Sequence, residues 1–341
     1  MTSNPTWGEK TAGSEVAKTF ADKIKGRNVV ITGVAPKGIG QSTASAIAAQ
    51  GPAHLILASR TKEKLEQSAT ELRSAHPGVD IQTVLLDLAS QASVREAAAA
   101  IAQRIPTLDL LINNAGAVVM TRQLTAEGIE LQFGANHIGH FLFTQQLMPL
   151  LEAAAAARDS ASGAGAGATR IINLSSQGHR CSPVRFHDIN IEGKEVPEEE
   201  RQPSYMPPTF TRANEDGYIP IAAYGQSKSA NILFSVGLQR RLKSRGIAFF
   251  SVHPGSMDTH LGRDHDPEMA EAISKTATYW KTLDQGSATT LVAALDPALN
   301  DSNEPYLSDC QFAEPAPWAK DAENAEKLWK LSEELIGEKF D

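Results

Sequence analysis

The chain has 341 residues, of which 41% are hydrophobic and 21% are charged, an ordinary balance for a globular protein with a large core. A formal net charge of −8 without a basic stripe argues against a sequence-independent nucleic-acid binder, which needs clustered Lys and Arg. Two cysteines, Cys181 and Cys310, are too few for a disulfide framework and fit a reducing compartment. With no basic, apolar leader and no bilayer-length apolar stretch, we expect a cytoplasmic protein without a membrane partner.

Short apolar runs alternate with helical patterns from residue 27 onward, in a single domain extending to residue 341. Before it, an arm of residues 1–26 places Val16, Phe20 and Ile24 at the spacing of a short amphipathic helix. In these runs the odd and the even positions are both apolar, as expected for strands that are buried on both faces of a parallel sheet. The order predicts a doubly wound, Rossmann-type α/β fold. We expect strands at 28–32, 55–58, 81–86, 108–113, 170–174 and 248–252, and helices at 42–50, 62–75, 93–104, 139–157 and 227–244.

Two segments interrupt this alternation. Residues 183–220 form a Pro-rich, charged insertion, and loops of that length inside a compact domain are usually functional or have structure of their own. Residues 311–341 form a helical segment in which Leu328, Leu331 and Leu335 fall at helical spacing. We expect this apolar face to close over the core, or alternatively over the substrate pocket.

A glycine-rich loop, residues 32–40 (TGVAPKGIG), follows the first strand and opens a helix. Glycines there let the backbone turn tightly and let a pyrophosphate reach the helix N-terminus, where free N–H groups and the dipole favour anions. A turn before any helix could give the same letters, but the position directly after the first strand favours a dinucleotide loop. The expected cofactor contacts are Gly33, Lys37, Gly38, Ile39 and Gly40.

The end of the second strand discriminates between cofactors. NAD-binding enzymes of this architecture place an acidic residue there for the ribose 2′-hydroxyl, whereas this chain has Ser59 and Arg60. Arg60 can grip a 2′-phosphate with a bidentate fork, and Lys37 adds a second positive charge nearby. Both could be ordinary surface cations, but their two positions favour NADP(H).

Two further segments are expected beside the cofactor. Asp87 follows the third strand, where it can accept a hydrogen bond from the adenine amino group or cap the next helix. Residues 113–116 (NNAG) end the fourth strand at the carboxyl edge of the sheet, where ligands bind in open α/β folds. We expect Asn114, Ala115 and Gly116 to form a wall of the cofactor site, although such letters also occur in turns.

Tyr224 and Lys228 are four residues apart at the start of a helix, and hence on one face of it. A free tyrosine has a pKa of about 10 and is a poor base near neutral pH. A nearby ammonium stabilises the phenolate and lowers that pKa, which proton transfer to or from an alcohol requires. Such a Tyr–Lys pair is common on solvated helix faces, so it indicates a catalytic site only when the accompanying motifs are present.

These motifs together resemble the short-chain dehydrogenase/reductase superfamily over residues 27–310. Residues 132–141 (QFGANHIGHF) and 175–179 (SSQGH) are similar to the branch that includes retinol dehydrogenases, WW-domain oxidoreductases and protochlorophyllide reductases. The motifs that carry the resemblance are, in chain order, the glycine loop, residues 113–116, Tyr224 with Lys228, and residues 253–255 (HPG).

The resemblance implies a role for each candidate residue. Tyr224 would exchange the proton with the substrate oxygen, and Lys228 would hold the nicotinamide ribose while lowering the pKa of the tyrosine. Ser176 would orient the carbonyl, with Ser175 as the alternative. Asn136 would carry a water-linked proton relay toward Lys228. The residues implied to line the nicotinamide carboxamide are Pro254, Gly255, Met257 and Thr259.

Two features depart from the family pattern. The glycine motif has four residues, 34–37, where the family usually has three, so we expect the turn to bulge. The insertion at 183–220 stands where monomeric carbonyl reductases of the family also carry one, and this favours a monomer over the usual helix-mediated dimer or tetramer.

The sequence thus predicts an NADPH-dependent oxidoreductase that acts on a carbonyl or alcohol. Its substrate pocket would be built from residues 117–123, 182–220 and the segment after residue 259, and the aromatic insertion favours a bulky apolar substrate. The histidines show no ligand set with metal-site spacing, so no metal is expected. Two alternatives stay open: a redox-inactive NADPH-binding sensor or scaffold, and a nucleotide-sugar epimerase or dehydratase on the same architecture.

Overall fold

The computed structural model describes residues 1–162, 168–258, 262, 265–300 and 302–340. Within these residues the chain forms an eight-stranded sheet of order β3-β2-β1-β4-β5-β6-β7-β8. Neighbouring strands pair in parallel except for β8, which is antiparallel to β7. The strands are β1 (Asn28–Thr32), β2 (His54–Ser59), β3 (Asp80–Leu85), β4 (Leu110–Asn113), β5 (Thr169–Leu174), β6 (Ile247–His253), β7 (Tyr306–Ser308) and β8 (Gln311–Phe312).

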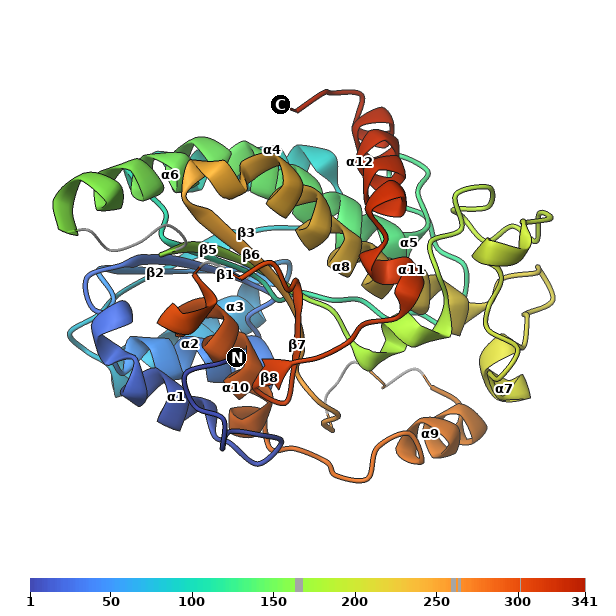
Figure 1. The fold of residues 1–341 in the computed structure, drawn as a ribbon, viewed down its shortest axis with the longest axis horizontal. Helices are drawn as coiled ribbons and strands as arrows, with labels where there is room; N and C mark the ends of the chain where they lie inside the picture. Colours follow the sequence, from blue (N-terminus) through green and yellow to red (C-terminus); the bar gives the residue numbers. More distant parts are fainter. Residues whose placement is uncertain (163–167, 259–261, 263–264, 301, 341) are drawn as a thin grey trace.

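Helices cover both faces of the sheet, as Figure 1 shows, with α4, α6 and α8 on one face and α2, α3 and α10 on the other. A π-helical turn, Gly134–Ile138, joins α5 to α6. The helices are α1 (Gly13–Thr19), α2 (Ile39–Ala48), α3 (Lys62–Ala75), α4 (Gln91–Ala102), α5 (Leu131–Phe133), α6 (Gly139–Ser162), α7 (Pro208–Thr211), α8 (Pro220–Leu242), α9 (Pro267–Ser274), α10 (Leu283–Leu295), α11 (Pro317–Lys320) and α12 (Ala322–Ile336).

The predicted doubly wound α/β fold is confirmed. Each predicted strand and helix is present; β1 and α3 have the predicted bounds, and the others have one or both ends shifted. The largest shift is at α8, which begins at Pro220 rather than at Ser227. Proline suits the first position of a helix because its φ is fixed there and its missing N–H is not needed. The sequence analysis assigned Pro220 to the Pro-rich insertion and therefore missed this helix start.

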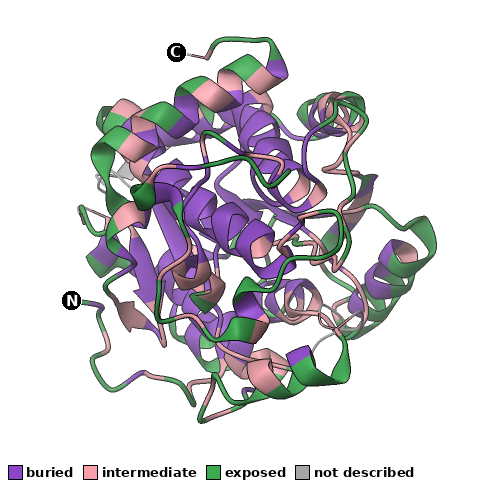
Figure 2. Ribbon diagram, turned by 90° about the vertical axis from the view of Figure 1, so that its right-hand side faces the viewer, coloured by how far each residue is buried: buried purple, intermediate pink, exposed green. Residues whose placement is uncertain are grey.

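The core lies on both faces of the sheet, and the sheet with its inner helices is largely buried (Figure 2). Strands β1, β4 and β5 are buried along their whole length, as the double-sided apolar runs predicted. The arm before β1 joins this core: Val16, Phe20 and Ile24 are buried against the face that carries α2 and α10. Helix α1 itself ends at Thr19, and a 3-10 turn, Ala21–Lys23, follows it.

The C-terminal helix α12 packs along α8 and the start of α6 (Figure 1). Leu328 and Trp329 are buried there. The Trp329 ring lies 4.9 Å from that of Phe141 and 6.2 Å from that of Phe234, measured between centroids. Of the two interpretations of this apolar helix face, the structure therefore favours closure over the core.

Candidate active site

The predicted site residues gather at the carboxyl ends of the central strands. The chain runs outward from β1 through β2 to β3 and then returns to β4 on the other side of β1. Connections therefore leave β1 and β4 in opposite directions, and open α/β sheets bind ligands at this position, in the crevice outside the carboxyl ends of the strands. The glycine loop, the 113–116 loop, the end of β5 and the start of α8 meet around it.

The glycine loop bulges at its extra residue. Gly33 has φ +73° and Lys37 has φ +59°, so the chain turns twice through the left-handed region. The backbone N–H of Lys37 donates to Gln41 Oε1 at 2.9 Å. Helix α2 then starts with Gly38 as its N-cap and no side chain capping it. Its first N–H groups are thus available to an anion, and the loop fits a pyrophosphate.

Two glycines of this loop are required by its packing against the 113–116 loop. A Cβ on Gly33 would lie 2.5 Å from Ala115 Cα, and one on Gly40 would lie 2.7 Å from Asn114 Nδ2. Asn114 Nδ2 donates to the carbonyl oxygen of Thr32 at 2.7 Å. The two loops therefore form one rigid wall, and Gly116 is exposed at its end.

Arg60 and Lys37 are both exposed. Within the described part of the chain, neither side chain forms an ion pair. Asp87 is half-buried, and its Oδ1 accepts from the backbone N–H of Ala89 at 3.0 Å. The N-cap of α4 is Ser90, whose side chain accepts from Ser93. The capping role considered for Asp87 therefore belongs to Ser90.

Tyr224 lies against the turn that follows β5. Its hydroxyl lies near the side chain of Ser176. A Cβ on Gly178 would be 2.7 Å from Tyr224 Cε1, so the ring is pressed against this turn. Burial raises the pKa of Tyr224, and the nearby Ser176 side chain opposes that rise.

Lys228 is 4% exposed, one turn after Tyr224. Its Nζ donates to the carbonyl oxygen of Leu174 at 3.0 Å and lies 5.7 Å from the centroid of the Tyr224 ring. A Cβ on Gly116 would be 3.5 Å from this Nζ. Burial lowers the pKa of Lys228 to about 8, so the ammonium is retained at neutral pH.

The two serines after β5 have different partners. Ser175 is buried, and its hydroxyl donates to the carbonyl oxygen of Lys228 at 2.8 Å. Ser176 Oγ instead accepts from the N–H of Gly178 at 3.0 Å, which leaves its hydrogen free to donate. Ser176 is thus the serine beside the tyrosine.

Asn136 lies in the π-helical turn, a distortion frequent at functional sites. Its Oδ1 accepts from the N–H of Ala117 at 2.7 Å, and its Nδ2 donates to Ala117 O at 3.0 Å and to Ser227 Oγ at 2.9 Å. The amide therefore ties the loop after Gly116 to helix α8. A Cβ on Gly116 would lie 3.8 Å from Asn136 Oδ1.

The segment after β6 borders the same crevice. Gly255 has φ +98°, and a Cβ there would lie 2.5 Å from the Lys281 side chain. Pro254 is buried. Met257 packs on Gly286 of α10, where any Cβ would collide with its sulfur. Thr259 is outside the described residues.

Comparison with known proteins identifies the family of this chain. Residues 27–183 match the model of the short chain dehydrogenase family. Retinol dehydrogenase 13 from Homo sapiens is 35% identical over 320 residues, which cover 92% of this chain and 86% of that protein. The chain belongs to the short-chain dehydrogenase/reductase superfamily, in its retinol dehydrogenase-like branch. It is therefore an NAD(P)-dependent oxidoreductase.

Other relatives agree with this placement. Short-chain dehydrogenase TIC 32 A, chloroplastic, from Brassica napus is 35% identical over 336 residues, 97% of this chain and 94% of that protein. A solved structure of an uncharacterised Mycobacterium paratuberculosis protein, 28% identical, matches with a TM-score of 0.65 and covers 93% of this chain and 96% of that one. No helix among the described residues is long and apolar enough to cross a membrane.

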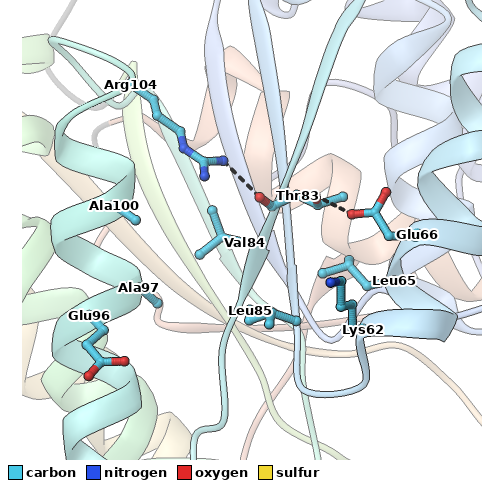
Figure 3. Close-up of a pocket in the computed structure, with 10 residues that line it drawn as sticks. All are labelled: Lys62, Leu65, Glu66, Thr83, Val84, Leu85, Glu96, Ala97, Ala100 and Arg104. Atoms are coloured by element: carbon cyan, nitrogen blue, oxygen red, sulfur yellow. Dashed lines mark hydrogen bonds between the residues drawn. The ribbon is translucent and has the colours of Figure 1, made fainter.

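This short-chain dehydrogenase/reductase also has a surface pocket away from its crevice. It lies at the outer edge of the sheet, between α3, β3 and α4 (Figure 3). Leu65, Val84 and Leu85 form its apolar floor, and Lys62, Glu66 and Arg104 rim it. None of the residues predicted for cofactor or catalysis lines this pocket, so the crevice remains the candidate active site.

Sequence reasoning did not single out two contributors to the site. Thr32 is fully buried, and its hydroxyl accepts from the N–H groups of Asn114 and Ala115, each at 3.0 Å. Its place directly before the first loop glycine was the available signal. The second is an apolar cluster from the three segments expected around the substrate: Phe210, Ile221 and Met269 are its buried members, packed with Met120, Cys181, Met206, Ala272 and Ile273. We call this cluster the apolar wall.

Proposed function

We propose that this enzyme transfers a hydride between NADP(H) and a bulky apolar carbonyl or alcohol, with Tyr224 as the proton donor or acceptor. One observation carries the proposal. The Tyr224 hydroxyl lies close enough to the Ser176 side chain for this serine to lower its pKa, and the buried Lys228 Nζ lies 5.7 Å from the centroid of the Tyr224 ring. These groups supply an acid, an orienting donor and a positive charge in one place.

The roles follow from the contacts of each side chain. Nicotinamide, when bound, supplies or accepts the hydride. In reduction, the Tyr224 phenol gives its proton to the substrate oxygen, and in oxidation the phenolate takes it back. Ser176 donates its free hydrogen to that oxygen, since Gly178 already occupies one acceptor site of its hydroxyl.

Lys228 acts on the tyrosine and on the cofactor. A buried ammonium stabilises a phenolate that forms nearby, and Tyr224 needs this support because burial raises its pKa. Its place near Gly116 suits a contact with the nicotinamide ribose as well. Asn136, linked to α8 through Ser227, holds the relay of protons toward this lysine.

The preference for NADP(H) rests on Arg60 and Lys37. Both are exposed cations without an ion-pair partner among the described residues. Arg60 directly follows β2 and Lys37 lies in the glycine loop, the two positions that would border a 2′-phosphate. No acidic residue follows β2 to accept from a free 2′-hydroxyl.

We expect NADPH to bind more tightly than NADH by about 2–4 kcal/mol, the contribution of one or two charge-assisted hydrogen bonds. Arg60→Ala should remove most of this preference, whereas Lys64→Ala, which removes an exposed cation of α3, should leave it intact. Titrating both cofactors by intrinsic fluorescence measures the difference. Equal affinities in the wild type, or an unchanged preference in Arg60→Ala, would show that the cofactor assignment is wrong.

The apolar wall supports a bulky apolar substrate. It joins the insertion to α9, and Arg212 reinforces the joint through ion pairs with Asp266 at 3.0 Å and Glu268 at 2.7 Å. Cys181 of the wall lies close enough to Tyr224 to affect its pKa. Relatives named retinol dehydrogenases support the same substrate class. Measuring NADPH consumption with a panel of ketones, aldehydes and quinones tests the proposal; no turnover of any would contradict it.

We also propose that the enzyme works in the reducing cytosol, which its two unpaired cysteines support.

We further propose that the enzyme is monomeric. The outer face of α8 is covered by α12, and Gln226 of α8 donates to the carbonyl oxygen of Ile189 in the insertion at 2.8 Å. Light scattering should give a mass near 36.5 kDa. A dimer or tetramer that persists on dilution would mean that another surface mediates assembly.

A further inference from the structure

A buried hydrogen-bonded path runs beneath the crevice through His140. This residue is 2% exposed and lies in the first turn of α6. Its Nε2 is 2.9 Å from Thr32 Oγ1, and its Nδ1 is 2.9 Å from the carbonyl oxygen of Asn136. One ring therefore bridges the end of β1 and the π-helical turn.

The direction of each hydrogen bond on this path is fixed by its partners. A hydroxyl has one hydrogen and two acceptor sites, and the N–H groups of Asn114 and Ala115 occupy both acceptor sites of Thr32. The Thr32 hydrogen is left for His140 Nε2, which must be unprotonated. The ring proton is then on Nδ1 and donates to the carbonyl oxygen of Asn136, which can only accept.

The surroundings hold the ring in this state. Burial lowers the pKa of His140 to about 4, against the hydrogen bond to Asn136 and with a contribution from the ammonium of Lys228, so the ring is neutral at physiological pH. Gly139 packs against the backbone of Leu88, where a Cβ would collide. The start of α6 is thereby fixed against the loop that follows β3, and the ring cannot shift without this helix.

We propose that His140 is a positioning residue that couples the cofactor wall to the relay asparagine. Through Thr32 it fixes the hydroxyl that holds Asn114 and Ala115, and through its other nitrogen it fixes the backbone of Asn136. Its effect on the relay rests on the proposed function, whereas its effect on the cofactor wall rests on the contacts alone.

Two variants separate the two hydrogen bonds. His140→Gln places an amide near the position of Nε2, so it can still accept from Thr32 but loses the donor to Asn136. We expect turnover to fall about tenfold, the effect of one lost buried hydrogen bond, with the Kd for NADPH within about twofold of wild type. His140→Asn places its amide near Nδ1 and leaves Thr32 without an acceptor. We expect the opposite split, with about tenfold weaker NADPH binding and nearly unchanged turnover at saturation.

A neighbouring histidine provides the matched control. His137 is equally buried in the π-helical turn, but its Nε2 is 2.8 Å from Ser332 of α12. His137→Asn should lower the Tm while leaving both Kd and turnover within about twofold of wild type. This separates loss of stability from loss of positioning.

The tautomer is tested directly in the protein without cofactor. Nitrogen-15 NMR of labelled histidines should show His140 with a protonated Nδ1 and a bare Nε2, the signal being assigned by its loss in His140→Gln. A protonated Nε2 would overturn the proposed coupling between the cofactor wall and Asn136. The coupling would also be overturned if, in both variants, Kd and turnover changed together and in proportion to the loss of Tm. If the wild type turned over no carbonyl substrate, the proposed function would fail, and the Kd and NMR measurements would still decide the link from Thr32 through His140.

Discussion

Tyr224→Phe is expected to lower turnover by a factor on the order of 10² or more, the usual contribution of a positioned acid or base. The substitution keeps the ring and its packing against Gly178 and removes only the hydroxyl, which lies near Ser176. The affinity for NADPH should therefore change little. Steady-state rates on the best substrate, with a cofactor titration beside them, measure both quantities.

Tyr218→Phe is the matched control for this experiment. Tyr218 is fully buried in the insertion, and its hydroxyl donates to Glu130 Oε1 at 2.8 Å, away from Ser176. Its removal should lower the Tm without a comparable loss of turnover. If Tyr224→Phe kept wild-type turnover, the acid–base assignment would be wrong. Tyr205, 68% exposed, and Tyr218 would then be the next residues to test.

Lys228→Met is expected to lower turnover on the order of 10² or more and also to weaken NADPH binding. The methionine keeps most of the aliphatic stem and removes the ammonium that supports the phenolate and the ribose contact. A scaffold protein would instead show no NADPH turnover to lose and would keep its binding function in this variant and in Tyr224→Phe. If turnover fell while the affinity for NADPH stayed unchanged, Lys228 would not contact the nicotinamide ribose.

The stability of Lys228→Met should change in the opposite sense. Burial lowers the pKa of this lysine from 10.5 to about 8, so the folded state holds the proton less tightly than the unfolded state. Below pH 8 the wild type bears the full cost of a buried charge, and the variant should melt at a higher temperature. This advantage should shrink as the pH rises from 8 to 10.5 and then vanish. Paired melting curves across that range test the sign.

The parallel sheet could be predicted because its central strands are apolar on both faces. This pattern is typical of parallel sheets that are covered by helices on both sides. β7 and β8 could not be predicted, since runs of three and two residues carry no periodicity. The alternation also predicted that β1, β4 and β5 end at one edge of the sheet, and Gly33, Gly116 and Ser176 follow these strand ends in the structure.

The parts of the site that sequence could not supply depend on three-dimensional packing. The π-helical turn at Asn136 leaves no periodic trace in residues 131–140. The pairing of His140 with Thr32 joins residues 108 positions apart, and only the folded sheet brings them together. The apolar wall likewise combines α7 with α9, whose residues gave loop-like patterns when read singly.

Because α12 packs on α8, the outer face of the catalytic helix stays exposed during synthesis until the C-terminal helix has left the ribosome. Phe234, whose ring lies 6.2 Å from that of Trp329, lacks the cover of this tryptophan for that interval. Exposed apolar surface of this kind makes a nascent chain prone to aggregation and draws chaperones. We therefore expect the fold to be completed only once α12 has docked, so that substitutions that weaken this docking should lower the yield even when every active-site residue is intact.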